Sequence, residues 1–522
     1  MKKIKYSQWV MALLLGFVGC GGDFSGDDGG GASDPSQEPG GGNVGFGGAQ
    51  DIGQFRSILD SGGVPGEATL DANGFFSEHY TELPPPECGQ VLCAHGMLAV
   101  GSSWLTGDYQ AALQIAMNTQ VDPTELERLP LNLVVVVDTS GSMLADDRLG
   151  YVKQGLNLLI EQLEDGDRLA LISYSRDVWV HSDLSVPLDR AALYQRVQEL
   201  TANGSTNIYD GLRTGLQMAA DNFDLERQNR VILLSDGMAT AGITNDFSIL
   251  SMAVDFISDG IGLTTIGVGQ DFNVELMRGL AERGAGNFYF VESAEATEEV
   301  FVDELDYFVT PLAVAVELTV DAGAGYSLGE AVGTRLWQAE GNRATVFIPG
   351  VFVASRLSDE PDPNGGRRGG GSKIIVPMIP TGVTPPDPRE VASISLRYRL
   401  PGTSEVLEQS ITVNNPADPG VPPSDYLYIS HQAMAENYAM YNIYLGLREA
   451  TRAADTDYNC AMSVLDTLVG ELARWNAEFG DEDIAADQAL IAQFMGNLSA
   501  AGALSPEELG FDACLGYDDY YE

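Results

Sequence analysis

The segment Leu131-Asn132-Leu133-Val134-Val135-Val136-Val137-Asp138-Thr139-Ser140-Gly141-Ser142 decides the fold class of this chain. Its first seven residues form a nearly continuous apolar run rich in valine, which is typical of a strand buried on both faces of a parallel sheet. Directly after the run, Asp138, Ser140 and Ser142 place three oxygen-bearing side chains at alternate positions. The segment therefore predicts a buried parallel strand whose carboxyl end carries a polar site.

Predicted strands and helices alternate on the C-terminal side of this segment. The pattern predicts strands over 169–174, 230–234, 262–268 and 287–291, and helices over 148–163, 190–200, 209–222, 247–257 and 274–281, with 294–308 closing the series. Strands that alternate with amphipathic helices of this length form a parallel sheet covered on both faces. We therefore expect a doubly wound, Rossmann-like α/β domain over residues 131–310.

Two further polar loops belong to the same predicted rim. Asp236 follows the strand 230–234, and Thr206 precedes the helix 209–222. Ligands of parallel sheets gather at the carboxyl ends of the strands, so these residues should meet the polar end of the first strand. The expected metal ligands are Asp138, Ser140, Ser142, Thr206 and Asp236. Carboxylate and hydroxyl oxygens are hard donors that suit Mg²⁺, Mn²⁺ or Ca²⁺.

This constellation resembles the metal-ion-dependent adhesion site of the von Willebrand factor type A (VWA) family. The family pattern is DxSxS, a distant Thr and a distant Asp, and the five residues above match it in order. The resemblance covers about residues 130–310. It implies that a carboxylate from a protein partner completes the coordination of the metal, so that the domain binds partners without catalysing a reaction.

The same residue types have a purely structural interpretation. Ser and Thr after strands often cap helices, and Asp-Gly often forms a turn. Asp210 is interpreted as a helix-start acid, outside the metal ligands. The pair Asp146-Asp147 precedes a predicted helix, where carboxylates favour the helix dipole, and is interpreted as capping.

Composition and missing motifs argue against several classes of function. The 522 residues carry 28 Lys and Arg against 75 Asp and Glu, a formal net charge of −47 at pH 7, which argues against nucleic acid as a partner. The chain has no P-loop, and none of its four histidines lies beside a Gly-x-Ser-x-Gly elbow. We therefore expect a binding protein rather than an enzyme. The alternatives are an envelope assembly or scaffold factor that docks partners without metal and, less favoured, a metal-dependent hydrolase.

The N-terminus predicts export and lipid attachment. Lys2, Lys3 and Lys5 precede a short apolar run that ends in Gly19-Cys20, which resembles a bacterial lipobox. We expect a signal peptide over 1–20, lipidation of Cys20 and a Gly-rich flexible linker over 21–50. An ordinary secretory signal is the alternative. Gly21-Gly22 resembles lipoproteins sorted to the outer membrane, so the expected location is the bacterial cell envelope, anchored in the lipid bilayer.

Four cysteines remain after Cys20. An even number in an exported chain suggests two disulfides, and the local pairing among the three possible ones is Cys88–Cys93 with Cys460–Cys514. Cys88, Cys93 and His95 could also be read as half of a zinc site, but no second cluster completes it.

The flanks predict a companion domain. The stretches 313–320, 344–353, 373–379, 391–400 and 406–413 alternate apolar and polar residues, as half-buried strands do. We expect the N-terminal flank 51–130 and the region 311–415 to form one β-sandwich-like domain into which the α/β domain is inserted. A helical C-terminal region should follow over 424–522.

Overall fold

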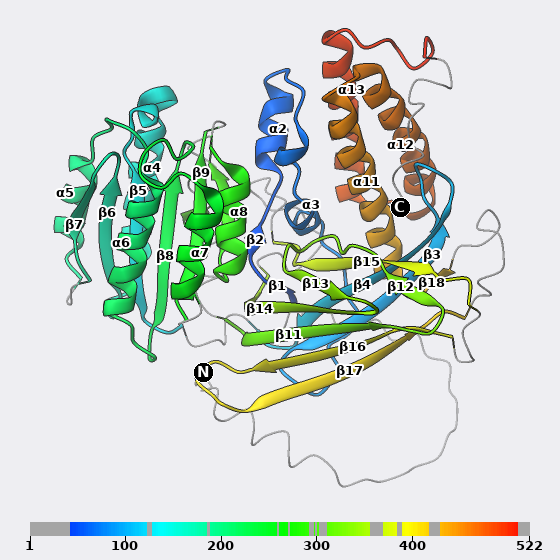
Figure 1. Ribbon diagram of the computed structural model, residues 1–522, viewed down its shortest axis with the longest axis horizontal. Coiled ribbons are helices and arrows are strands. Elements are labelled where there is room, and N and C mark those ends of the chain that lie inside the picture. Colours follow the sequence, from blue (N-terminus) through cyan, green and yellow to red (C-terminus); the bar gives the residue numbers. More distant parts are fainter. Residues whose placement is uncertain are drawn as a thin grey trace, which may run out of the picture.

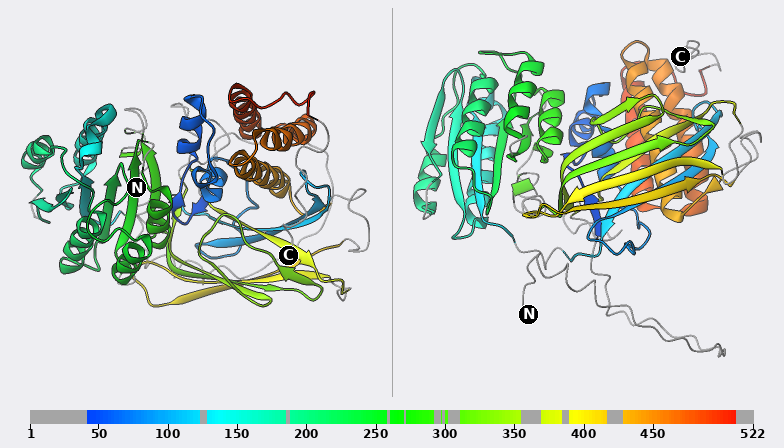
Figure 2. Two further views of the ribbon diagram at one scale, coloured as in Figure 1. Left: turned by 45° about the horizontal axis from the view of Figure 1, so that its top comes forward. Right: turned by 60° about the horizontal axis from the view of Figure 1, so that its bottom comes forward.

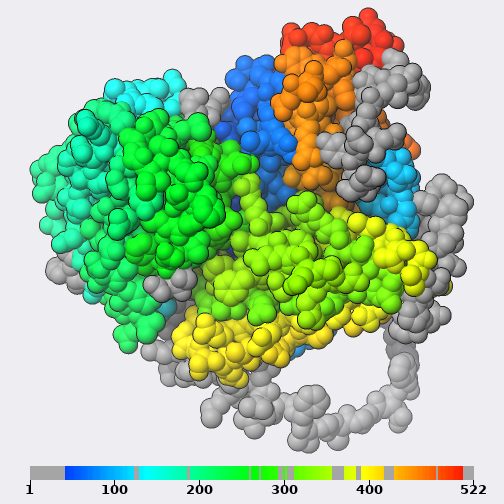
Figure 3. All heavy atoms as spheres, viewed as in Figure 1, coloured from blue at the N-terminus to red at the C-terminus, as the bar shows by residue number. Residues whose placement is uncertain are grey.

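The computed structural model describes residues 42–122, 128–184, 188–257, 260–269, 272–291, 297, 300–301, 311–354, 369–383, 389–416 and 428–509, without the side chains of 478 and 479. Three parts pack together: an α/β domain, an antiparallel β domain and a group of C-terminal helices (Figure 1). In the space-filling view, the N-terminal segment lies between the α/β domain and these helices (Figure 3).

The α/β domain contains a seven-stranded sheet. Its order is β2 (Gly48–Ala49), β10 (Asn287–Val291), β9 (Gly262–Val268), β8 (Gln228–Ser235), β5 (Leu131–Asp138), β6 (Arg168–Tyr174) and β7 (Val178–Ser182). All neighbouring pairs are parallel except β6 and β7. All eight residues of the inner strand β5 are buried, as its apolar run predicts. The edge strand β7 was not predicted; it begins with Val178-Trp179-Val180, but all five of its residues are only partly buried or exposed.

Helices cover both faces of this sheet, which confirms the predicted doubly wound class. Leu133, Val135 and Val137 of β5 share a core with α4 (Arg148–Gln162) and α5 (Arg190–Glu199). Val134 and Val136 share a second core with α6 (Ile208–Asp221), α7 (Asp246–Ile257) and α8 (Val274–Arg283). This is the period-two alternation of a strand buried on both faces. Of the predicted segment 294–308, only residues 297, 300 and 301 lie among the described residues.

The β domain is a single antiparallel sheet that folds over on itself. Its main path is β12 (Tyr326–Leu328), β15 (Lys373–Pro380), β4 (Tyr109–Thr119), β1 (Gly42–Gly45), β14 (Arg343–Val353), β11 (Ala313–Ala322), β16 (Glu390–Arg399) and β17 (Val406–Asn414). Three strands branch from it: β3 (Cys93–Ser102) on β4, β13 (Trp337–Glu340) on β14 and β18 (Tyr428–Ile429) on β3. Leu98 and Ile115 share one apolar core with Leu318 and Ile394, so the two halves face each other as in a sandwich.

The N-terminal segment joins the two sheets and departs from the predicted linker. Residues 42–45 form β1, which pairs with both β4 and β14, and residues 48–49 form β2, which pairs with β10 of the α/β sheet. Val44 and Phe46 are fully buried in the apolar core of the β domain. Glycine-rich composition predicted a flexible linker up to residue 50, but the described part of that stretch is ordered because its two large apolar side chains enter a core.

The outer face of β3 and β4 is covered by helices. These are α11 (Gln432–Ala454), α12 (Tyr458–Phe479) and α13 (Glu482–Ala500), joined by η1 (Glu67–Thr69), α2 (Gly53–Asp60) and α3 (Ala72–Ser77) from the N-terminal flank (Figure 2). Met97 and Ala112 pack into this core, whereas their neighbours in sequence face the other half of the sheet. The N-terminal flank 51–130 was expected to be part of the β domain; its strands β3 and β4 are, but α2 and α3 pack with the C-terminal helices instead. Among the described helices, none is both long and apolar enough to cross a membrane.

Candidate metal centre

The polar rim lies where β5 and β8, neighbours in the sheet, end at Asp138 and Ser235. The loop before α6 is tied to the loop after β5 by two backbone hydrogen bonds: Gly141 N–H donates to the Gly204 carbonyl at 3.0 Å, and Asn203 N–H donates to the Thr139 carbonyl at 2.7 Å. These bonds hold residues 203–206 against the DxSxS loop.

Four of the five predicted ligands form one hydrogen-bonded chain. The backbone N–H of Ser140 donates to Asp138 Oδ1 at 2.8 Å, and Ser140 Oγ lies 2.9 Å from Ser142 Oγ. The Ser142 hydroxyl then donates to Asp236 Oδ1 at 2.8 Å. Asp138 and Asp236 are both fully buried. The structure thus places these residues together, although 98 positions separate the two aspartates in the sequence.

Thr206 lies beside the same chain. A β-carbon added to Gly237 would lie 3.7 Å from Ser142 Oγ and 3.9 Å from Thr206 Oγ1, so both hydroxyls border this glycine. The backbone of Thr206 is held by Thr240, whose hydroxyl accepts from Thr206 N–H at 2.9 Å. All five predicted ligands therefore meet at one rim.

Asp138 is held by residues that the sequence reasoning missed. Its Oδ2 accepts from the Ser235 hydroxyl at 2.9 Å and from the Tyr174 hydroxyl at 3.3 Å. Burial raises the pKa of Asp138 to about 6; the hydrogen bonds from Ser140 and Ser235 oppose the increase, and the nearby charge of Asp236 adds to it. Burial likewise raises the pKa of Tyr174, which therefore stays a neutral donor. Two carboxylates held this close in a buried site favour the arrival of a cation.

Arg148 is the third residue that the sequence reasoning missed. Its Nη1 lies 3.1 Å from Asp236 Oδ2, and its side chain is only 9% exposed. Gly269, with a φ of +74°, makes room for it, because a β-carbon there would lie 2.5 Å from Arg148 Nε. A signal did exist: Arg148 is the first residue of α4, where the helix dipole disfavours a cation. A basic side chain at that position indicates a compensating carboxylate nearby.

The acids interpreted as helix-start residues lie next to this site. Asp147 is the N-cap of α4 but makes no capping hydrogen bond through its side chain, which corrects the capping interpretation. Asp146 and Asp147 instead adopt positive φ angles of 49° and 56°, in the turn that leads into α4. Asp210 lies in the first turn of α6 and accepts from Asn207 Nδ2 at 2.7 Å, as a helix-start acid does.

The residues present fit a hard divalent cation. Two buried carboxylates and three hydroxyls offer oxygen donors only, the set preferred by Mg²⁺, Mn²⁺ and Ca²⁺. Among the described residues, no group of three or more His, Cys, Asp or Glu side chains is arranged to hold a metal ion. Recognition of this site therefore depends on its hydroxyls as well as its carboxylates.

The cysteines form disulfides in the described part of the chain. Cys88 and Cys93 are bonded to each other, so their sulfurs are not zinc ligands. His95 Nε2 lies 2.7 Å from Asn118 Oδ1. Cys460 is also disulfide-bonded, whereas Cys514 and Cys20 lie outside the described residues.

Comparison with known proteins agrees with this geometry. Residues 132–303 match the family model of the von Willebrand factor type A domain. The chain is 32% identical over 197 residues to the uncharacterized protein YfbK of Escherichia coli, covering 37% of this chain and 34% of that protein. It is 29% identical over 252 residues to inter-alpha-trypsin inhibitor heavy chain H1 of Sus scrofa, covering 45% of this chain and 26% of that protein.

A solved structure, von Willebrand factor type A from Catenulispora acidiphila, has a similar fold. It aligns with a TM-score of 0.51 and 16% identity, covering 75% of this chain and 87% of that one. The chain therefore contains a VWA domain at residues 132–303, within a larger fold of which most is also found in that structure. Its match spans about a third or less of the length of the two curated relatives named above.

Proposed function

We propose that this chain is a lipid-tethered envelope protein that binds a protein partner through a divalent cation held at the VWA rim. VWA domains are protein-interaction modules, and the observation that carries the metal-dependent part is the convergence of Asp138, Ser140, Ser142, Thr206 and Asp236 at one rim. When bound, the cation supplies a Lewis-acidic position that a partner carboxylate can occupy.

The charges at the rim favour an acidic partner group. Asp138 and Asp236 bring two negative charges, and Arg148 returns one positive charge. A divalent cation therefore turns the net charge of the site from negative to positive. In a buried setting such a charge attracts a carboxylate strongly, because the local dielectric constant is low.

Binding rather than turnover is supported by where the serine hydroxyls point. Ser140 and Ser142 contact each other, and Ser142 donates to Asp236. A serine nucleophile of the Ser-His-Asp type needs a histidine beside it, whereas the four histidines hydrogen-bond to groups outside the rim: the side chains of Asp487, Asn118 and Ser173 and the backbone N–H of Ala433.

The test is a metal titration of wild type and Asp138→Asn. Asparagine keeps the acceptor for Ser140 N–H but removes the charge, so the metal-free fold should remain intact. With Mg²⁺ or Mn²⁺ at about 100 times its Kd, the wild type should gain about 2.7 kcal/mol in unfolding free energy, and Asp138→Asn should gain much less. Denaturation followed by circular dichroism, with isothermal titration, measures both.

Asp210→Asn is the matched control, because Asp210 lies at the start of α6 outside the ligand set. It should respond to metal as the wild type does. An equal metal response in wild type and Asp138→Asn would place the cation elsewhere. A partner that still binds in excess EDTA would favour the alternative, a scaffold protein whose VWA domain docks without metal.

A further inference from the structure

A large cavity lies away from the metal rim, where the three parts of the molecule meet. Its volume is about 1380 Å³, and it is lined by α8 of the VWA domain, by η1 and α3, by the ends of β4 and β15, and by α11. Typical small-molecule pockets measure about 300–1,000 Å³ and occur preferentially between domains. This space is large enough for a short peptide.

Three of the four arginines that line the cavity have carboxylate partners. Asp71 accepts from Arg335 at 3.2 Å and lies 3.8 Å from Arg278. Arg452 pairs with Glu67 at 2.5 Å. These pairs connect α8, the N-terminal flank and α11, so they have a structural role and are already neutralised.

The fourth, Arg448, has no such partner. In the described part of the chain its side chain forms neither an ion pair nor a hydrogen bond, and its Nε is buried without an acceptor. Its guanidinium lies 5.7 Å from the ring centre of Tyr444, one turn earlier on α11. A partly buried guanidinium without an acceptor is costly, and an incoming anion removes that cost.

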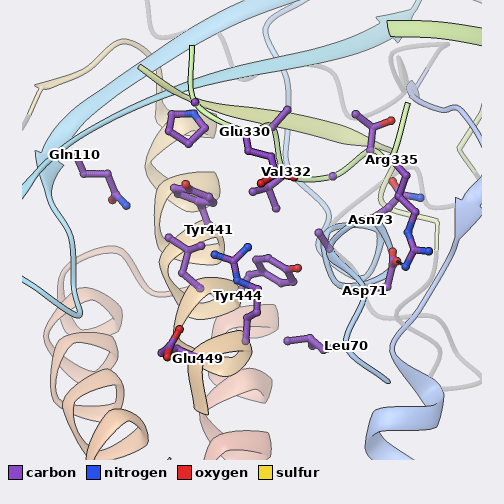
Figure 4. A pocket seen from close by; sticks show the side chains of 18 of the residues that line it. Leu70, Asp71, Asn73, Gln110, Glu330, Val332, Arg335, Tyr441, Tyr444 and Glu449 are labelled. Carbon is purple, nitrogen blue, oxygen red and sulfur yellow. Dashed lines mark hydrogen bonds and ion pairs between the residues drawn. The ribbon is translucent and has the colours of Figure 1, made fainter. Parts of the chain in front are cut away.

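Tyrosines form the wall beside this guanidinium. Tyr441 and Tyr444 project from α11 into the cavity, between Glu330 and Glu449 in the view of Figure 4. The Tyr444 ring is buried, and its hydroxyl makes no hydrogen bond with another described residue. Arg448 and the Tyr444 hydroxyl thus offer N–H and O–H donors to one anionic group.

The other lining charges decide what kind of anion fits. Glu275 of α8, Glu449 of α11 and Glu330 of the loop after β12 have no ion-pair partner among the described residues. Their negative charge repels a polyanion such as a nucleotide but attracts amino groups. The lining therefore suits a ligand with one carboxylate and one or more cationic groups.

We propose that this cavity binds a short peptide, with its C-terminal carboxylate on Arg448 and its basic groups near the glutamates. The aromatic rings of Tyr441 and Tyr444 would contact its apolar parts. Because α8 and α11 both line the cavity, the bound peptide would also link the VWA domain to the C-terminal helices. This site is independent of the metal rim.

The test compares two synthetic peptides on the full mature chain by isothermal titration. The probes are Lys-Gly-Lys-Gly-Phe with a free C-terminal carboxylate and the same peptide with a C-terminal amide. A charged hydrogen bond contributes about 1.5–3 kcal/mol, so the free acid should bind about tenfold to a hundredfold more tightly. Arg448→Met should abolish that difference.

Three controls make the result specific. Arg474→Met removes an arginine from the exposed surface of α12 and should bind both peptides as the wild type does. Asp138→Asn should also bind them normally, which separates this site from the metal rim. Arg448→Met should keep the wild-type circular dichroism spectrum and melt at the wild-type temperature or above it, because its side chain has no ion pair to lose and its unpaired guanidinium is costly.

Three outcomes would overturn the proposal. They are equal binding of the acid and the amide, wild-type binding by Arg448→Met, and no binding of either peptide. Pyrophosphate is the third probe: tighter binding of pyrophosphate than of the free-acid peptide would assign the cavity to a phosphate ligand instead.

Discussion

The two carboxylate oxygens of Asp236 already contact Ser142 and Arg148, and the proposed metal would bind the same oxygens. Its Oδ1 accepts from Ser142, and its Oδ2 faces Arg148 at 3.1 Å. Arg148 therefore acts as an internal cation in the absence of metal, since it offsets the charge of a fully buried carboxylate. Gly269 is needed for this ion pair, because a side chain at that position would displace the Arg148 guanidinium.

Arg148→Met should lower the stability of the metal-free protein and enlarge its response to metal. Removing one partner of a buried ion pair costs about 3–5 kcal/mol, because the other charge stays buried. A divalent cation can neutralise the buried charge that Asp236 keeps once Arg148 is removed. Mg²⁺ should therefore raise the unfolding free energy of Arg148→Met by more than it raises that of the wild type. Denaturation with EDTA and with excess Mg²⁺ measures this.

Arg343→Met is the control for that variant. Arg343 pairs with Asp321 on the surface, where the two side chains are 65% and 38% exposed. Such a pair contributes about 0–1 kcal/mol, so this variant should stay close to the wild type in both conditions. An unchanged metal response in Arg148→Met would show that Arg148 has only a structural role.

The raised pKa of Asp138 predicts how the metal-free protein responds to pH. A folded-state pKa of about 6, against the ordinary aspartate value of 3.8, means that the folded state holds this proton more tightly than the unfolded chain. The contribution of this proton to the free energy of unfolding is fully present below pH 3.8 and is lost as the pH rises through 6. At about 1.4 kcal/mol per pKa unit, the loss is about 3 kcal/mol.

Asp138→Asn should remove this loss, because asparagine does not ionise. In EDTA, the unfolding free energy of the wild type should fall between pH 4.5 and pH 7.5 by more than that of Asp138→Asn. Urea denaturation at the two pH values measures the difference. The same pH dependence in both proteins would contradict the raised pKa.

At the scale of elements, β2 fixes the VWA sheet to the rest of the chain through two glycines. Gly47 has a φ of +83°, and a β-carbon there would lie 2.6 Å from the Gly286 carbonyl oxygen. That close approach lets Gly48 N–H donate to the same oxygen at 2.9 Å. The glycines that suggested a linker are thus needed for the contact between the two backbones.

Gly47→Ala should destabilise the protein by more than its backbone angle alone explains. Gly62→Ala is the matched control, because Gly62 has a φ of +81° but no atom within 4 Å of the added β-carbon. The control should cost about 1–2 kcal/mol for the left-handed conformation. Gly47→Ala should cost clearly more in urea denaturation, and an equal cost would show that the contact with Gly286 adapts easily.

At the scale of the whole molecule, the proposed lipid tether decides where the binding rim operates. Cys20 follows a short apolar segment and precedes the glycine-rich stretch that leads to β1. A lipid on Cys20 would hold the folded domains at a membrane surface, and two or more acyl chains bind membranes stably.

Cys20→Ser should move the processed protein from the membrane pellet to the soluble fraction and abolish acyl labelling. Ser25→Ala, a few residues away, should remain lipidated and in the pellet. Fractionation with metabolic acyl labelling follows both. A processed Cys20→Ser protein that still carries the label and pellets with membranes would reject lipid attachment at this residue.

Local sequence was sufficient for the VWA sheet and for the five rim residues. A buried parallel strand needs apolar side chains on both faces, so 131–137 could be recognised without knowing its neighbours. The ends of parallel strands must meet at one rim, which is why Asp138 and Asp236 could be brought together from sequence alone.

Contacts between distant segments could not be deduced in this way. Arg148 and Gly269 meet only because α4 begins beside the end of β9, and Tyr174 reaches Asp138 only from the neighbouring strand. The ordering of residues 42–49 depends on partners more than two hundred positions away in β10 and β14. Local patterns specify which face of an element is apolar, whereas the packing of the whole chain determines what covers that face.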